Sequence, residues 1–238
     1  MKTVRITIIT VIALSIASMM GCKKSSTRSV ASGSSKLSFQ LAVKNGTTLA
    51  TPASDTIPGL VWTAGTADVS KFSFEARRNG VSIEIESNNL TTVNLFGVSP
   101  VTTYVTLDTG IYKEIEVTAF LDHSSTDTIP LKLTGTFKTD SGKTVPIQFD
   151  LMSDARIKVE EKNIDLNGTA TVTALVDIAL DKLMNGITAA DLDKATLTNG
   201  GIVISKTSNS WLYFKILANI SGCGHAEWRE DHHDHGDD

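Results

Sequence analysis

The chain has 238 residues, of which 41% are hydrophobic, 20% charged and 6% aromatic. This length and composition exclude a disordered or fibrous protein and allow one sizeable core or two modest ones. The formal net charge of −4 excludes the basic surface typical of a nucleic-acid-binding protein, and two cysteines exclude a disulfide-dense scaffold.

The first 21 residues have the features of a secretory signal peptide. Lys2 and Arg5 give a short positive region, and a mostly apolar stretch follows at residues 6–20. That stretch is shorter than the roughly 20 residues that a membrane-spanning helix needs. Gly21 and Cys22 come directly after it, and a small residue before a cysteine at this point resembles the lipobox of bacterial lipoproteins. An ordinary secretory signal followed by an incidental cysteine is the other interpretation.

The lipobox resemblance implies that the signal peptidase cuts before Cys22 and that the Cys22 thiol carries a diacylglycerol. Several acyl chains hold a protein stably on a membrane, at about 0.8 kcal/mol for each buried methylene. Residues 22–35 would then be the lipidated cysteine and a flexible, Ser-rich tether. No acidic residue follows Cys22 closely, which in that family is compatible with the outer membrane. We therefore expect a cell-envelope protein, anchored to the outer membrane through the lipid on Cys22.

Alternation of apolar and polar residues predicts strands from residue 37 to about residue 178. Two alternating runs flank Asn79-Gly80, and this pair is a strong hairpin signal because both turn residues must tolerate positive φ. Short strands separated by turn residues are typical of an antiparallel β-sandwich, which we expect at residues 36–151. Pro146 lies inside one alternating run and predicts an edge strand there.

One corner of the sandwich is predicted near residue 110. Gly110 forms a turn that leads into Tyr112, whose ring can close the corner. The order Leu107, Gly110, Tyr112 is similar to a Leu-x-x-Gly-x-Tyr stretch of transthyretin-like and immunoglobulin-like bacterial domains. The resemblance implies a sandwich of that kind.

Helical signals appear only near the C-terminus, so we predict a smaller α+β part at residues 152–222. Thr188 and Asp191 have the spacing of a capping box at the start of a short helix. A final helix is predicted to begin after a cap at Ser208 or Asn209. Its apolar positions recur every four residues, at Leu212, Ile216 and Ile220.

The order of signal, tether, β-sandwich and helix-bearing end resembles uncharacterised Gram-negative lipoproteins. The likeness includes an Ile-x-Ile-Ser-x-x-x-Asn stretch, formed here by Ile202, Ile204, Ser205 and Asn209. It covers most of the mature chain up to Gly222 and implies a fold and a location but no activity.

The last segment, residues 223–238, is acidic and rich in histidine, and we expect it to be a disordered tail. Imidazole and thiolate groups are ligands that suit Zn²⁺, Cu²⁺ or Ni²⁺. The candidate metal ligands in this segment are Cys223, His225, His232, His233 and His235. An acidic tail that only keeps the protein soluble is the other interpretation.

The chain contains no phosphate loop, dinucleotide fingerprint, nucleophile elbow or zincin helix. His123 lies between Asp122 and Ser124, but adjacent residues cannot all aim at one substrate atom, so we expect a solvated loop. Alternating glutamates are expected on the solvent side of a sheet, as in the pairs Glu84/Glu86 and Glu114/Glu116.

Three aromatic residues, Trp62, Tyr112 and Trp211, could serve as platforms for a sugar, but packing in the core or at a corner is favoured for each. We therefore predict that the protein is not an enzyme and has a structural or binding role toward an unknown protein or glycan partner. The alternative function is capture or buffering of a divalent metal by the tail.

Overall fold

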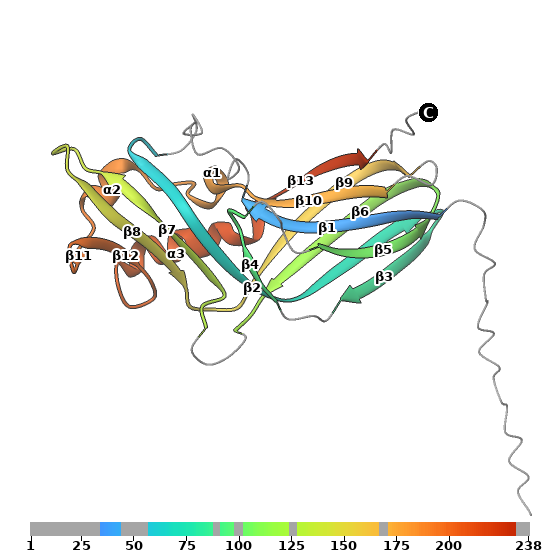
Figure 1. Cartoon of the computed structure of the whole chain (residues 1–238), viewed down its shortest axis with the longest axis horizontal. Helices are drawn as coiled ribbons and strands as arrows, with labels where there is room; N and C mark the ends of the chain where they lie inside the picture. The colour runs from blue at the N-terminus through green and yellow to red at the C-terminus, as the bar shows by residue number, and fades with distance from the viewer. Residues whose placement is uncertain are drawn as a thin grey trace, which may run out of the picture.

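The structure is a computed structural model, and it describes residues 34–43, 57–87, 91–97, 102–123, 128–166 and 171–231. Two β-sheets and a group of short helices form an elongated body (Figure 1). The mainly β fold class is confirmed, with the helices near the C-terminus as predicted. The predicted signal peptide, Cys22 and nearly all of the predicted tether lie outside the described residues.

The smaller sheet has four strands and joins segments that are far apart in the sequence. Its order is β13 (Gly224–Asp231), β10 (Thr171–Ile178), β1 (Ser34–Val43) and β5 (Thr102–Asp108). The β1–β10 pair is parallel and the other two pairs are antiparallel.

The larger sheet has nine strands, and the 19-residue β2 is its central strand. Its order is β11 (Leu197–Thr198), β12 (Gly201–Ile204), β8 (Thr144–Leu151), β7 (Leu131–Lys138), β2 (Leu60–Arg78), β6 (Gly110–Leu121) and β9 (Ala155–Leu166). Two further strands, β3 (Val81–Ser87) and β4 (Thr91–Asn94), also pair with β2. The β8–β12 pair is parallel, so this pair and β1–β10 depart from the antiparallel pattern expected from the sequence.

The hairpin predicted at Asn79-Gly80 is confirmed. Strands β2 and β3 pair in antiparallel register up to Arg78 and Val81, which leaves a two-residue turn. Asn79 has φ 51° and Gly80 has φ 75°, the left-handed backbone that these two residue types adopt at low cost.

The corner predicted at Tyr112 is also confirmed. The Tyr112 side chain is fully buried, and its hydroxyl donates a 2.8 Å hydrogen bond to the backbone oxygen of Asp108. This bond spans the turn between β5 and β6 and ties the small sheet to the large one. Gly110, at φ 141°, allows the backbone to make that turn.

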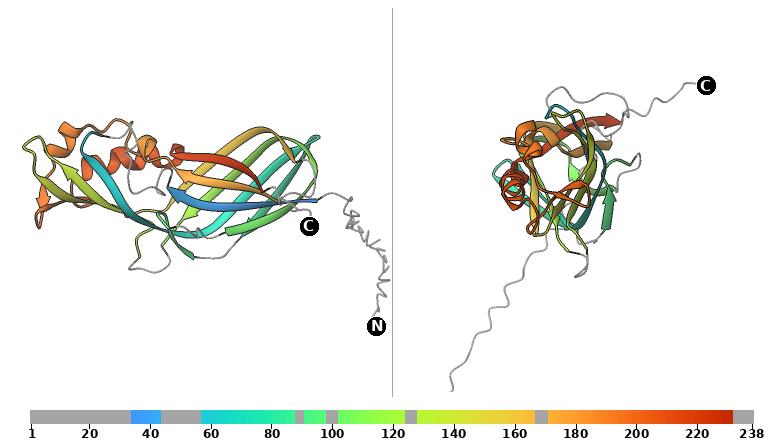
Figure 2. Two further views of the ribbon diagram at one scale, coloured as in Figure 1. Left: turned by 45° about the horizontal axis from the view of Figure 1, so that its top comes forward. Right: turned by 90° about the vertical axis from the view of Figure 1, so that its left-hand side faces the viewer.

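The small sheet lies over one half of the large sheet, and the helices lie at the other half (Figures 1 and 2). A single cluster of buried apolar side chains runs through both halves, from Leu37 on β1 to Leu212 on the last helix. The sandwich and the α+β part therefore share one core, which is the main source of stability for both.

The helical half contains three α-helices and one 3-10 turn among the described residues. They are α1 (Leu180–Leu183), α2 (Ala189–Asp193), α3 (Ser210–Asn219) and η1 (Ile220–Gly222). The capping box of α2 is confirmed, because the Thr188 side chain accepts from the Asp191 N–H and the Asp191 carboxylate accepts from the Thr188 N–H.

Helix α3 begins where predicted, but the Asn209 side chain does not cap it. Its Oδ1 accepts a 2.8 Å bond from the Thr196 N–H, and its Nδ2 donates to the backbone oxygens of Thr196 and Val203. The Ile-x-Ile-Ser-x-x-x-Asn stretch therefore has a structural role, because its Asn209 bonds hold the start of α3 against the end of the large sheet.

The structure divides the chain differently from the boundaries expected at residues 151 and 222. Strands β9 and β10 lie in the predicted α+β part but complete the two sheets of the sandwich. Strand β13 takes up the first part of the predicted tail, because it adds to the sheet beside β10. The edge strand predicted from Pro146 is wrong, since β12 pairs with β8 from Ile147 onward, immediately beyond the proline.

Candidate ligand-binding face on helix α3

Helix α3 has apolar residues on two opposite sides. One side is packed on the core through Leu212, Tyr213 and Ile216, all fully buried. On the other side, Trp211 is 41% exposed and Phe214 is 55% exposed. Positions three and seven residues apart lie on the same side of a helix, so the exposed Ala218 continues this stripe. Trp211, Phe214 and Ala218 are called the α3 face below.

The orientation of α3 is fixed by Tyr213. The Tyr213 ring lies 6.1 Å from the ring of Phe149 on β8 and meets the Phe214 ring edge-on at 5.4 Å. Its hydroxyl accepts a 3.2 Å bond from the Met152 N–H and lies 3.2 Å from the Ser153 hydroxyl oxygen. These contacts hold the inner side of α3 against the sheet, and its outer aromatic residues remain exposed.

Lys215 joins the α3 face to the neighbouring helices. Its Nζ lies 5.3 Å from the centre of the Trp211 ring, donates a 3.1 Å bond to the backbone oxygen of Gly186, and lies 3.5 Å from Asp191 Oδ2. The pKa of Asp191 is lowered, first by the bond from the Thr188 N–H and also by the Lys215 charge. The Trp211 ring and the turn after α1 are thus linked through one lysine.

A depression of about 500 Å³ adjoins the α3 face. Its lining residues are Asp181, Lys182, Asn185, Ala218, Asn219, Ser221 and Gly222. Ala218 belongs to both the depression and the α3 face, so the two are continuous. Asn219, one of these lining residues, donates through its Nδ2 to the backbone oxygens of Leu183 and Asn185 at 3.0 and 2.8 Å.

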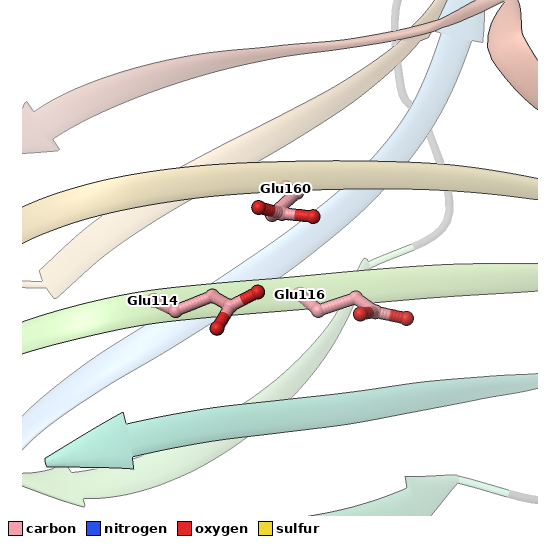
Figure 3. A group of neighbouring side chains, drawn as sticks. All are labelled: Glu114, Glu116 and Glu160. Carbon is pink, nitrogen blue, oxygen red and sulfur yellow. The ribbon is translucent and has the colours of Figure 1, made fainter.

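A cluster of three carboxylates lies elsewhere, on the outer surface of the large sheet. Glu114 and Glu116 on β6 face Glu160 on β9 (Figure 3), with oxygens within 4.8 Å of one another. Cations already pair with these groups: Lys158 Nζ lies 2.6 Å from Glu116, and Lys162 Nζ lies 3.2 Å from Glu160. The bond from Lys162 lowers the pKa of Glu160. The cluster is an ion-pair network of a solvent face, as the alternation of glutamates predicted.

His123 lies two residues after the end of β6, and its Nδ1 is 3.0 Å from Asp154 Oδ1 in an exposed pair. The neighbouring Asp122 carboxylate instead accepts a bond from the Ser70 hydroxyl. The two side chains therefore have different partners, and Ser124 lies outside the described residues.

The predicted metal ligands of the C-terminal segment differ in their placement. Cys223 is fully buried, its Sγ donates to the backbone oxygen of Ile220 at 3.0 Å, and burial raises the pKa of the thiol to about 12. A thiol that stays protonated is a poor metal ligand. His225 lies on β13 opposite Asp177, and His232, His233 and His235 lie outside the described residues. Metal capture by these histidines stays a prediction.

Among the aromatic residues singled out from the sequence, Trp62 and Tyr112 are buried, as predicted. The core or corner position predicted for Trp211 is wrong, because the ring lies on the outer side of α3. The signal that could have shown this is the helical spacing itself. Trp211 is out of phase with Leu212 and Ile216, which define the inner side.

No family model, curated protein or solved structure matches the chain. None of the helices in the described part of the chain has the length and apolar character to cross a membrane.

Proposed function

We propose that this chain is a lipid-anchored protein of the cell envelope, and that it binds a ligand without converting it. The observation that carries the binding role is the aromatic α3 face, exposed on a folded body and continuous with a polar depression. Exposed apolar surface rimmed by polar groups is typical of interaction sites. The anchor is proposed from the Gly21-Cys22 pair after the apolar stretch.

The start of β1, which follows the proposed anchor in the chain, and the helices lie at opposite ends of the small sheet. Ser34, at the start of β1, pairs with Asp108. The β10 residue beside the start of β1 pairs with Asp231, so the first residues of β1 and the last residues of β13 lie at the same end of the small sheet. The opposite end of this sheet is the Val43 end, and the helices follow from it (Figure 1). The eleven residues 23–33 can span about 36–40 Å when fully extended. A lipid on Cys22 would therefore attach the body to the membrane at its Ser34 end, opposite the end from which the helices follow.

The chemistry of the depression supports binding more than catalysis. Its lining residues include no histidine, and the nearby thiol of Cys223 is buried with a raised pKa. The groups that are present, a carboxylate, an ammonium, two amides and a hydroxyl, are suited to hydrogen bonding.

Mass spectrometry of the protein extracted from membranes tests the anchor. We expect a mature chain that begins at Cys22 and carries the added mass of its acyl chains. A Cys22→Ala variant should lose that mass. A chain that begins elsewhere, or an unmodified Cys22 thiol on a protein that washes off membranes, would contradict the proposal.

A further inference from the structure

We propose that the α3 face and the adjoining depression bind an uncharged saccharide of two or more sugar rings. The proposal rests on the proposed function and names the ligand class of that same site. Its components are an exposed aromatic ring, the hydrogen-bonding side chains that line the depression beyond Ala218, and Lys215, which contacts the ring and donates to the backbone oxygen of Gly186.

The aromatic ring supplies the first part of the recognition. Trp211 is 41% exposed on a helix whose opposite side is packed on the core. The face of an aromatic ring carries partial negative charge, and the C–H groups on one side of a pyranose ring carry partial positive charge. A sugar can therefore contact the exposed part of the Trp211 ring beside Lys215, with Phe214 on the same side of the helix.

The depression supplies donors and acceptors for hydroxyl groups. A sugar hydroxyl both donates and accepts, so a site for it needs both kinds of partner. Asp181 offers acceptors, Lys182 offers donors, and Asn185 offers both. Asn219 uses its Nδ2 on two backbone oxygens, which fixes its Oδ1 in place with no donor among the described residues.

The charges of the depression favour a ligand with no net charge. Asp181 and Lys182 are adjacent and of opposite sign, and the other lining residues are neutral. At the Trp211 end, Lys215 lies 3.5 Å from Asp191 Oδ2, so its charge is also balanced. An anionic or cationic ligand would meet a like charge as readily as an opposite one.

The length of the site indicates more than one sugar ring. Trp211 and Ala218 are seven residues apart on one helix, which corresponds to about 10 Å along its axis. A ring stacked on Trp211 therefore leaves room for at least one more unit before the depression. The extended arrangement favours an oligosaccharide over a monosaccharide.

An apolar protein helix fits the same surface less well. The apolar stripe has only three residues and ends at the depression. An apolar partner that covered it would also cover Asp181 and Lys182 and leave their polar groups without water or partners, which is costly. A saccharide brings hydroxyl groups to those positions.

Calorimetric titration of the full-length lipidated protein in nanodiscs tests the proposal. The probes are maltotriose, cellotriose and N,N′,N″-triacetylchitotriose. We expect at least one to bind with a Kd in the range of about 0.01–1 mM, and Trp211→Ala and Asn185→Ala each to weaken that binding at least about tenfold. Tyr104→Ala is the matched control. Like Trp211, Tyr104 is an exposed aromatic residue beside a lysine: it is 60% exposed, and Lys36 Nζ lies 4.0 Å from its ring centre. It lies on the small sheet, away from the α3 face. This control should bind as the parent does.

Three results would overturn the saccharide proposal: no binding of any probe, unchanged binding by Trp211→Ala, or an equal loss in Tyr104→Ala. Tighter binding of a sulfated trisaccharide than of its neutral counterpart would also overturn it. The proposed function is judged separately. New reducing ends after incubation of the protein with the trisaccharides would show that it cleaves them, and would contradict the proposal that it does not convert its ligand. The mass of the Cys22 peptide from the same sample shows whether Cys22 is acylated.

Discussion

The ammonium group of Lys215 lies 5.3 Å from the centre of the Trp211 ring. The same ammonium group donates a hydrogen bond to the backbone oxygen of Gly186 and forms an ion pair with Asp191. Its three partners lie on α3, in the turn after α1 and on α2. This contact favours one orientation of an exposed tryptophan on the α3 face. An ordered ring loses less conformational entropy when it binds a ligand.

The Lys215–Trp211 contact should be measurable in a double-mutant cycle. We expect a coupling free energy of about 0.5–1 kcal/mol between Lys215→Ala and Trp211→Ala, the range for cation–π contacts at exposed sites. Urea denaturation of the parent, the two single variants and the double variant gives this value. Strictly additive effects on the free energy of unfolding would show that the two side chains do not interact.

The Tyr112 hydroxyl should contribute to the stability of the sandwich. Tyr112→Phe removes the bond to the backbone oxygen of Asp108 inside a buried corner. We expect a loss of about 0.5–1.5 kcal/mol in the free energy of unfolding, measured by urea denaturation. Tyr104→Phe, at an exposed position, should change it by less than about 0.5 kcal/mol. Equal effects of the two substitutions would argue against the corner bond.

The Cys223 thiol should be protected in the folded protein. Because the thiol is buried and its pKa is raised to about 12, we expect iodoacetamide to label Cys223 only after unfolding. Labelling is followed by mass spectrometry with and without urea. Fast labelling of the native protein at neutral pH would contradict the buried position.

The same pKa shift predicts a dependence of stability on alkaline pH. The folded pKa of about 12 is above the ordinary value of 9.0, so the native state holds the proton more tightly than the unfolded chain does. The contribution is complete below pH 9.0 and is lost as the pH rises toward about 12. The free energy of unfolding should therefore fall more steeply above pH 9.0 in the parent than in Cys223→Ala. Parallel curves for the two proteins would contradict this prediction.

Asn209 should be needed both for its side chain and for its backbone conformation. It has φ 49°, and its amide makes three bonds to Thr196 and Val203. Asn209→Gly can still adopt the positive φ of this position but lacks the three side-chain bonds. We therefore expect a loss of about 1–3 kcal/mol in the free energy of unfolding. Asn209→Ala should cost about 1 kcal/mol more, because alanine is strained at positive φ. Thermal or urea denaturation of both variants tests this order, and stability equal to the parent in Asn209→Gly would contradict the role of the amide.

Local features of the fold could be predicted from the sequence because they depend on residues close together in the chain. The turn at Asn79-Gly80 depends on two residues that accept positive φ. The capping box depends on Thr188 and Asp191, three positions apart, and the corner depends on Tyr112 and Asp108, four positions apart. The alternating strands follow in the same way from a period of two.

Contacts between distant segments were decided only by the tertiary structure. Alternation shows which face of a strand is buried, but it does not name the neighbouring strand. For this reason the parallel pairs β1–β10 and β8–β12, and the addition of β13 to the small sheet, could not be predicted. The exposure of Trp211 has the same origin. The core contacts the Leu212 side of α3, and no second layer among the described residues covers the other side. An aromatic residue that composition alone would place inside therefore remains at the surface.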